Sequence, residues 1–127
     1  MPRIRIESTA QFPEKTAQAL MDGVMDAVAA VLALPADDRN ISFSAYPSGM
    51  FVMKPPYRIF IEILLFSGRT AAAKKELYRA IVTTLEHRLA IPKEQVMIVL
   101  NEQPRGNWGI RGGCSADEVA LDFRVDV

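Results

Sequence analysis

Residues 3–7 of the chain read Arg-Ile-Arg-Ile-Glu, and residues 58–62 read Arg-Ile-Phe-Ile-Glu. Later landmarks repeat in the same order, Leu34-Pro35 as Ile91-Pro92 and Pro47 as Pro104. An internal repeat sets the architecture of a chain, because each copy is expected to form the same structural unit. The sequence therefore predicts two related halves, residues 2–47 and residues 57–104, followed by a tail over residues 105–127.

Each half is predicted to form a strand, a helix and a strand. In the first half, residues 3–7 and residues 40–46 alternate apolar and polar side chains at the period of a strand. Between them, Pro13 suits the first turn of a helix, and Pro35 ends that helix. The apolar stripe of this helix recurs at three- and four-residue spacing and consists of Leu20, Met21, Val24, Met25, Val28, Val31 and Leu32.

The second half repeats this order. Residues 58–66 and residues 95–100 are predicted strands, the first almost continuously apolar, as in a strand covered on both faces. Thr70 is the predicted N-cap of the helix between them, and Pro92 ends that helix. The apolar stripe of the second helix consists of Leu77, Tyr78, Ile81, Leu85 and Leu89. In the tail, residues 120–125 are predicted to add a short edge strand.

Two strand-helix-strand units predict an α/β fold. A crossover helix joins parallel strands in a right-handed sense, so two such units side by side give a four-stranded mixed sheet with two helices on one face. Residues 47–57 form a loop rather than a domain linker, because neither half could bury a core alone, and residues 1–127 are predicted to form one domain. Apolar residues on both sides of the strands would leave the uncovered face apolar, which predicts an oligomer.

The composition limits the class of protein. Lys plus Arg and Asp plus Glu each number 15, so the formal net charge is zero. This balance argues against a general nucleic-acid or anionic-membrane binder. No signal peptide is visible, and the most apolar segment, residues 27–34, is too short to span a bilayer. Cys114 is the one cysteine, so no internal disulfide is possible and a reducing, cytoplasmic location is expected.

Pro2 is the first candidate for chemistry. Removal of Met1 would leave a free secondary amine at the start of the first predicted strand. A primary α-amino group titrates at about 7.7–8.0, and desolvation lowers the pKa of an amine. Such a group can act as a base when it is neutral, or as an acid when the site stabilises the cation. A Met-Pro start also occurs in many proteins without a catalytic role.

Charged residues at two predicted turns are further candidates. Arg69 precedes the second helix, whose N-terminal N–H groups favour anions, and an arginine there can bind a carboxylate through two parallel hydrogen bonds. Asp38 follows Pro35, near the amino end of the chain, and a carboxylate beside Pro2 could hold an ammonium group or a water. Asp37 fits this position equally well by spacing. Each of these residues could also be an ordinary exposed turn residue.

The tail and the second helix contain weaker candidates. Trp108, the one tryptophan, is expected either to wall an apolar pocket or to plug the core. Arg111 is a second possible carboxylate binder. His87 is expected to be an exposed helix residue, and Cys114 lacks the basic surroundings of a reactive thiol. No metal-ligand spacing or phosphate loop is present, so no metal site is expected.

A proline that opens a strand, a duplicated unit and an arginine at a strand-to-helix turn resemble the tautomerase superfamily. Three segments are similar to malonate semialdehyde decarboxylases: residues 34–39 (Leu-Pro-Ala-Asp-Asp-Arg), residues 67–70 (Ser-Gly-Arg-Thr) and residues 107–112 (Asn-Trp-Gly-Ile-Arg-Gly). The resemblance implies a homotrimer without a cofactor. It also implies the roles of the candidates, with Pro2 as the acid–base group, Asp38 as the aspartate beside it, Arg69 as the functional arginine before the second helix and Trp108 in an apolar wall.

One position departs from the decarboxylases, which carry a second arginine two residues before the position of Arg69. This chain has Ser67 there, and the loss of one cation weakens the binding of the carboxylate and carbonyl groups of a β-keto acid. The sequence therefore predicts a keto–enol tautomerase for a small 2-keto acid or its enol, with Arg69, Trp108 and Arg111 binding the substrate. The alternatives are a decarboxylase- or hydratase-like lyase with a protonated Pro2, and a non-catalytic trimer that binds a ligand.

Overall fold

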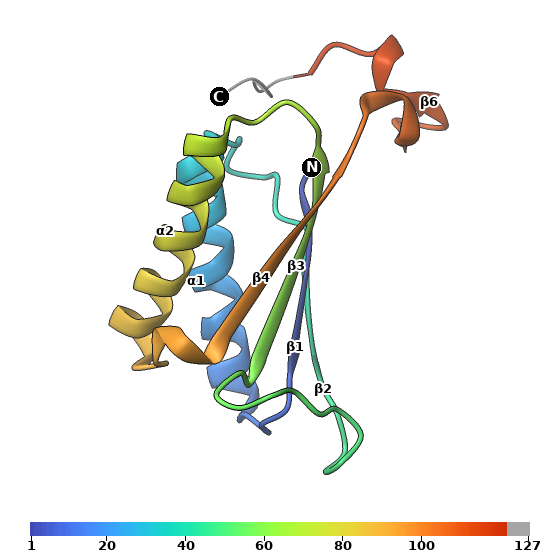
Figure 1. The fold of residues 1–127 in the computed structure, drawn as a ribbon. Helices are drawn as coiled ribbons and strands as arrows, with labels where there is room; N and C mark the ends of the chain where they lie inside the picture. Colours follow the sequence, from blue (N-terminus) through green and yellow to red (C-terminus); the bar gives the residue numbers. More distant parts are fainter. Residues whose placement is uncertain (122–127) are drawn as a thin grey trace.

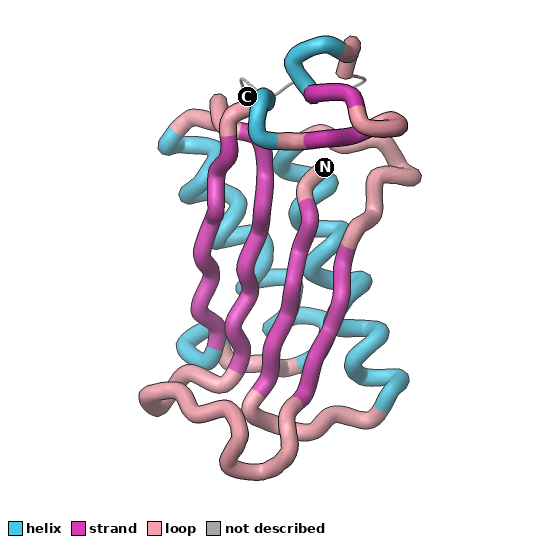
Figure 2. The backbone as a smooth tube through the Cα atoms, turned by 90° about the vertical axis from the view of Figure 1, so that its right-hand side faces the viewer, coloured by secondary structure: helices cyan, strands magenta, loops and turns pink. Residues whose placement is uncertain are grey.

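A computed structural model gives the fold of the chain and describes residues 1–121. Within this range, two long helices pack on one face of a four-stranded sheet, so that the molecule has a helix layer and a sheet layer (Figures 1 and 2). The elements of the two layers are β1 (Arg3–Ser8), α1 (Glu14–Leu32), β2 (Ile41–Ala45), β3 (Ile59–Phe66), α2 (Ala71–Leu89) and β4 (Val96–Gln103). The 3-10 helix η1 (Lys93–Gln95) leads into β4.

The strands of this sheet lie in the order β2-β1-β3-β4. β1 pairs with β2 in parallel and β3 pairs with β4 in parallel, each pair being connected through a helix. The two halves meet where β1 and β3 run antiparallel, with Ile6 opposite Ile61. The predicted α/β architecture, a mixed sheet with α1 and α2 on one face, is therefore confirmed.

The helices of the two halves end in the same way. Ala33 after α1 and Ala90 after α2 adopt the left-handed conformation, with φ of 53° and 56°. This turn stops each helix before the proline that the sequence indicated as its end. At the start of α1, the structure corrects the prediction for Pro13, which has an extended ψ of 149° and precedes the helix rather than lying in its first turn.

The core lies between the two layers. Alternate residues of β1 and β3 face the helices and are buried, as the period-two pattern predicted. The helices bury most residues of the predicted apolar stripes. Tyr78 is an exception, since it is 36% exposed one position beyond the buried Leu77, on the solvent side of α2. The buried side chains of this core include Ile4, Ile6, Leu20, Val24, Val28, Ile61, Ile63, Leu77, Ile81 and Leu85.

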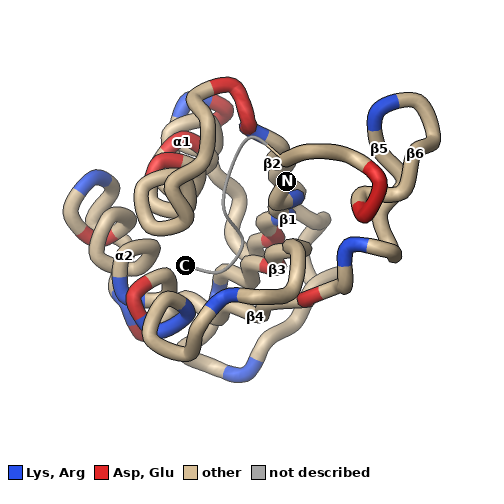
Figure 3. The backbone as a smooth tube through the Cα atoms, turned by 90° about the horizontal axis from the view of Figure 1, so that it is seen from above, with Lys and Arg blue, Asp and Glu red and all other residues tan. Residues whose placement is uncertain are grey.

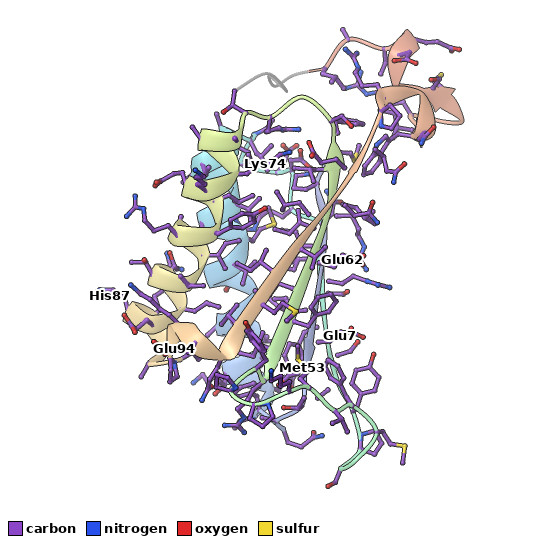
Figure 4. All side chains as sticks on the ribbon, viewed as in Figure 1. Glu7, Met53, Glu62, Lys74, His87 and Glu94 are labelled. Carbon is purple, nitrogen blue, oxygen red and sulfur yellow. The ribbon has the colours of Figure 1, made fainter. Side chains whose placement is uncertain are left out.

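The opposite face of the sheet is not covered by helices (Figure 2). The side chains on this face differ between the strands. Along β3 and β4 this open face carries the apolar side chains of Phe60, Leu64, Met97 and Val99, together with the polar side chains of Glu62, Asn101 and Gln103. Along β1 it is polar: Arg5 pairs with Glu62 at 2.7 Å, and Glu7 accepts a hydrogen bond from Tyr46 (Figure 4). The prediction of an apolar open face is therefore right only for part of β3 and β4. It is wrong for β1, whose charged groups are satisfied by partners such as Glu62 of β3.

The tail crosses the end of the sheet at which the amino terminus lies (Figures 1 and 2). It contains the 3-10 helices η2 (Arg105–Asn107) and η3 (Ala116–Glu118) and the short strands β5 (Gly109–Ile110) and β6 (Cys114–Ser115). The predicted edge strand over residues 120–125 falls mostly outside the described residues, and Ala120 and Leu121 are not in a strand.

Two surface properties bear on the class of protein. Basic and acidic residues are both spread around the molecule (Figure 3). In the described part of the chain, no helix combines the length and the apolar character that crossing a membrane requires.

Candidate active site

The register of the sheet brings several chain segments to one end of the molecule. β1 begins with Arg3 opposite Leu64, close to the end of β3, and Phe66 at that end lies opposite Gln103 of β4. Ile4 pairs with Ile41, so the loop before β2 reaches the same end. The amino terminus, the α1–β2 loop, the β3–α2 turn and the start of the tail therefore meet there.

The amino terminus contacts Asp38 directly. The amino group of Met1 lies 2.5 Å from each carboxylate oxygen of Asp38, whose side chain is 13% exposed. Pro2 is buried, whereas Asp37 is exposed. The geometry thus separates the two aspartates that spacing left equal, because Asp38 is the one turned toward the amino end.

Asn40 connects the same groups. Its side-chain Nδ2 donates to the carbonyl of Pro2 at 3.2 Å and to Oδ1 of Asp38 at 2.9 Å. Its backbone carbonyl accepts from the N–H of Ile4 at 2.8 Å, which continues the pairing of β1 with the segment before β2. One residue therefore ties the start of β1 to the carboxylate.

Arg69 lies in the turn between β3 and α2 and is 6% exposed. Its Nη1 donates to the carbonyl of Phe66 at 3.1 Å. Burial lowers the pKa of Arg69, and the charge of Glu102 opposes this shift. Glu102 itself forms an ion pair with Lys74 of α2 (Figure 4). A cation held in this turn, beside the N-terminus of α2, is suited to bind a carboxylate.

The structure gives Trp108 a defined partner. The rings of Trp108 and Phe66 meet edge to face, with centroids 4.9 Å apart and an interplanar angle of 68°. The indole Nε1 donates to the carbonyl of Gln103 at 3.4 Å. Trp108 therefore packs from the tail against Phe66, the last residue of β3.

A family model described as "Tautomerase enzyme" matches residues 39–111, which is more than half of the chain. The chain belongs to the tautomerase family. This assignment confirms the resemblance stated from the sequence and makes the protein an enzyme of the isomerase type. It favours the enzymatic hypotheses over a purely ligand-binding trimer.

Named tautomerases are among the similar sequences. The probable tautomerase YusQ of Bacillus subtilis (strain 168) is 26% identical over 121 residues, covering 89% of this chain and 95% of that protein. The 2-hydroxymuconate tautomerase of Pseudomonas putida is 35% identical over 60 residues, covering 47% of this chain but 94% of its own length. A short relative that matches less than half of this tautomerase is what a duplicated unit predicts.

Solved structures share the fold. A malonate semialdehyde decarboxylase is similar with a TM-score of 0.80 and 18% identity, covering 89% of this chain and 93% of that one. The FG41 malonate semialdehyde decarboxylase, inhibited by 3-bromopropiolate, has a TM-score of 0.77 and 26% identity over 94% of this chain and 98% of its own. A fused 4-OT has a TM-score of 0.80 and 20% identity, with 91% and 96% covered.

Other candidates of this tautomerase lie outside the contacts described above. Arg111 is exposed in the turn between β5 and β6, and its Nη1 donates to the carbonyl of Ala120 at 2.8 Å. His87 is exposed on the outer side of the last turn of α2, far from the amino terminus (Figure 4). Among residues 1–121, no group of three or more His, Cys, Asp or Glu side chains could hold a metal ion.

Two polar residues of the site were missed by the sequence analysis. The sequence placed Asn40 only at the start of a strand, and its bonds to Pro2 and Asp38 appear only in the folded chain. Glu102 continues the helix-facing series of β4, since it lies opposite the buried Leu65. The signal that could have identified Glu102 is a charged side chain at a position of β4 where the alternating pattern calls for an apolar one.

Proposed function

We propose that this protein is a cofactor-independent keto–enol tautomerase that acts on a small 2-keto acid or its enol. In this proposal Met1 is removed, and the secondary amine of Pro2 accepts the proton of the enol hydroxyl as the C=O bond forms. The amine then returns a proton to the neighbouring carbon, so the net reaction moves one proton and needs no co-reactant. General acid–base catalysis of this kind contributes typically about 10²–10⁴ in rate.

The contact between the amino end of the chain and Asp38 carries the proposal. The nitrogen of Pro2 is three covalent bonds from the nitrogen of Met1, which limits their separation to about 4 Å. Removal of Met1 therefore leaves the amine of Pro2 within about 6 Å of the Asp38 carboxylate, the range at which a charge shifts a neighbouring pKa. Pro2 is buried, and desolvation opposes the effect of Asp38 by favouring the neutral amine.

Arg69 and Trp108 supply the substrate-binding part of the proposal. The buried guanidinium of Arg69 would hold the carboxylate of a 2-keto acid, with the N-terminus of α2 beside it. The ring of Trp108, packed on Phe66, would exclude water from one side of the substrate. Arg111 remains a candidate for a second contact to the substrate, from the tail.

A decarboxylase- or hydratase-like lyase is the second candidate, and a specific observation favours it. A carboxylate as close to the amino end as Asp38 stabilises an ammonium group, which suits a protonated Pro2 acting as an acid. The relative at 26% identity, the FG41 malonate semialdehyde decarboxylase, points the same way. Against this candidate stands Ser67, an exposed and uncharged residue at the position where a second arginine was expected.

The first test combines the intact mass of the purified protein with a phenylenolpyruvate ketonisation assay on the same sample. Loss of Met1 together with turnover that disappears when the terminal amine is blocked is the expected result. Turnover by protein that retains Met1 would refute the proline mechanism, since Pro2 would then be an amide without a basic nitrogen. Loss of Met1 without ketonisation, together with turnover of malonate semialdehyde, would refute the tautomerase proposal and support the decarboxylase- or hydratase-like lyase.

The pH dependence of kcat/KM separates the two candidates. A neutral Pro2 that acts as a base loses activity as the pH falls, whereas a protonated Pro2 that acts as an acid loses activity as the pH rises. A covalent probe tests the position of the amine independently of turnover: 2-oxo-3-pentynoate inactivates a similar structure with a TM-score of 0.82. We expect this compound to add its mass to the peptide that begins with Pro2.

We also propose a homotrimer as the assembly of this protein. Similar structures with TM-scores of 0.79 and 0.78 are described as symmetric trimers of fused 4-OT. The apolar part of the open face along β3 and β4 supports the proposal, and Val99 within it is 42% exposed. Val99→Lys should reduce the mass measured by light scattering, whereas Thr83→Lys on the exposed side of α2 should not.

A further inference from the structure

We propose that Asn40 is a positioning residue, which holds the Asp38 carboxylate and Pro2 in a fixed relation so that Asp38 acts on the amine of Pro2. This inference rests on the proposed function and assigns a role to a residue outside the set predicted from the sequence. The geometry is specific, because one side-chain amide donates both of its hydrogens, one to the carbonyl of Pro2 and one to Oδ1 of Asp38.

The groups that Asn40 contacts do not depend on Met1. The ion pair between Met1 and Asp38 disappears with the Met1 amino group. The two bonds from Nδ2 of Asn40 end on the carbonyl of Pro2 and on Asp38, and both groups remain in the processed chain. Asn40 is therefore a direct bridge between the first residue of the processed enzyme and the carboxylate.

The backbone makes this bridge rigid at one end. The carbonyl of Asn40 accepts from the N–H of Ile4, and Ile4 is fully buried in the core. The side-chain amide of Asn40 is therefore attached to a backbone segment that pairing with β1 holds in place. Asp38, in contrast, lies in the loop between α1 and β2, where its backbone N–H bonds to the carbonyl of Pro35.

The physical effect follows from how a carboxylate acts on an amine. A freely rotating Asp38 would average its position and weaken its effect on the ammonium form of Pro2. A donor on Oδ1 selects one orientation, which leaves Oδ2 available to the amine or to a water. Removing the donor should therefore lower the pKa of the Pro2 amine, in the same direction as removing the charge of Asp38 but by less.

The test compares Asn40→Ala, Asp38→Asn and the double variant. Competitive acetylation of the terminal amine with acetic anhydride, followed over pH by mass spectrometry, reports the pKa of the Pro2 amine without any substrate. Cleavage after Glu7 isolates residues 2–7, which contain no lysine, so the acetyl group reports on the amine alone. The pH profile of kcat/KM for phenylenolpyruvate gives a second readout.

We expect Asn40→Ala to lower the pKa of the amine by about half a unit or more, and kcat/KM by about 10-fold with most of the loss in kcat. In the Asp38→Asn background the same substitution should change neither, because Asn40 acts through Asp38. Arg39→Gln is the matched control: Arg39 lies between the two residues but pairs with Asp22 and Asp26 of α1, so its loss should leave the pKa of the amine unchanged.

An unchanged amine pKa in Asn40→Ala, or an effect that is fully additive with that of Asp38→Asn, would overturn the positioning role and leave Asn40 as a strand-pairing residue. If Asp38→Asn itself shifts neither readout, the failure lies in the proposed function and not in the role of Asn40 alone. Should Asn40→Ala not fold, Asn40→Ser keeps a polar group that is too short to reach both acceptors and should give the same shift.

Discussion

The amino group of Met1 and the carboxylate of Asp38 are 2.5 Å apart, although 37 positions separate them in the chain. The parallel pairing of β1 with β2 causes this contact, because the segments that precede the two strands must reach the same end of the sheet. The same pairing leaves Asp37 exposed. These neighbouring aspartates therefore form a matched pair for mutagenesis.

We predict that Asp38→Asn shifts the pH profile of kcat/KM to lower pH by about one unit, because the amine of Pro2 loses a nearby negative charge that favours its protonated form. Asp37→Asn should leave the profile unchanged. The measurement is kcat/KM for phenylenolpyruvate over the range in which the enzyme stays folded. Equal shifts in the two variants would mean that the effect comes from the net charge of the loop rather than from Asp38.

A second prediction concerns substrate binding by Arg69. Arg69→Lys keeps a cation but loses the planar fork that binds a carboxylate bidentately. We expect KM to rise by about 10- to 100-fold with a smaller change in kcat, which corresponds to the loss of a charge-assisted hydrogen bond. Arg79→Lys is the control, since Arg79 is exposed on α2 and pairs with Glu76 one turn away. A KM unchanged in Arg69→Lys would remove Arg69 from the substrate site.

A third prediction concerns stability and pH. The hydrogen bond from Arg88 to Asp26 lowers the pKa of Asp26 below its usual value of 3.8, partial burial opposes this, and Arg39 adds to the lowering. A lowered pKa in the folded state means that the stabilisation is present above 3.8 and is lost as the pH falls through the folded-state pKa. Asp26 is 42% exposed, so solvent screening limits the contribution to about 1 kcal/mol or less.

The free energies of unfolding of wild type and Asp26→Asn, measured in urea, should therefore differ near neutral pH and converge as the pH falls through the lowered pKa of Asp26. Asp22→Asn should have a smaller effect at neutral pH, because Asp22 is 73% exposed and lies 3.6 Å from Arg39. A difference between wild type and Asp26→Asn that persists at acid pH would show that packing, and not the ion pairs, accounts for the stabilisation.

A fourth prediction uses the repeated helix ends. Ala33 and Ala90 have positive φ, which costs a residue with a Cβ atom about 1–2 kcal/mol relative to the right-handed conformation. Glycine avoids this cost but loses more backbone entropy on folding. We therefore expect Ala33→Gly and Ala90→Gly each to raise the free energy of unfolding by up to about 1 kcal/mol.

Ala30→Gly is the matched control for these variants. Ala30 is exposed in α1, three residues before Ala33, and has helical backbone angles. The same substitution there should lower the free energy of unfolding by about 0.5–1 kcal/mol. Denaturant unfolding of the three variants under one set of conditions gives the change in the free energy of unfolding for each. A change of the same sign in all three would contradict the strain at the helix ends.

Much of the fold could be predicted because its signals are local. The period-two pattern of residues 3–7 and the apolar stripes of the helices define which side of each element faces the core. Thr70 was recognised as an N-cap from its residue type, and its side chain accepts a hydrogen bond from the N–H of Ala73 at 3.1 Å. The exact helix ends were less predictable, because the chain at Ala33 turns before Pro35 is reached.

The candidate site was predictable only in part. The segments that carry Pro2, Asp38 and Arg69 follow from the order of strands and helices, because the connections of a mixed sheet fix which strand ends meet. The charged groups on the open face of the sheet were not predicted. They form cross-strand pairs such as Arg5 with Glu62, which belong to different halves of the repeat.

The sequence by itself determined the two strand-helix-strand units, the faces that they bury and the residue types available at one end of the sheet, because side-chain periodicity and capping act over a few neighbouring residues. Residue spacing left Asp37 and Asp38 equal, the family resemblance implied Asp38, and the tertiary structure shows Asp38 at the amino end. Only the tertiary structure decided that Asn40 bridges Asp38 to Pro2 and that Glu102 neighbours Arg69. These relations join residues far apart in the chain, and their distances depend on how the strands of the two halves pair with one another, which a pattern within one segment does not specify.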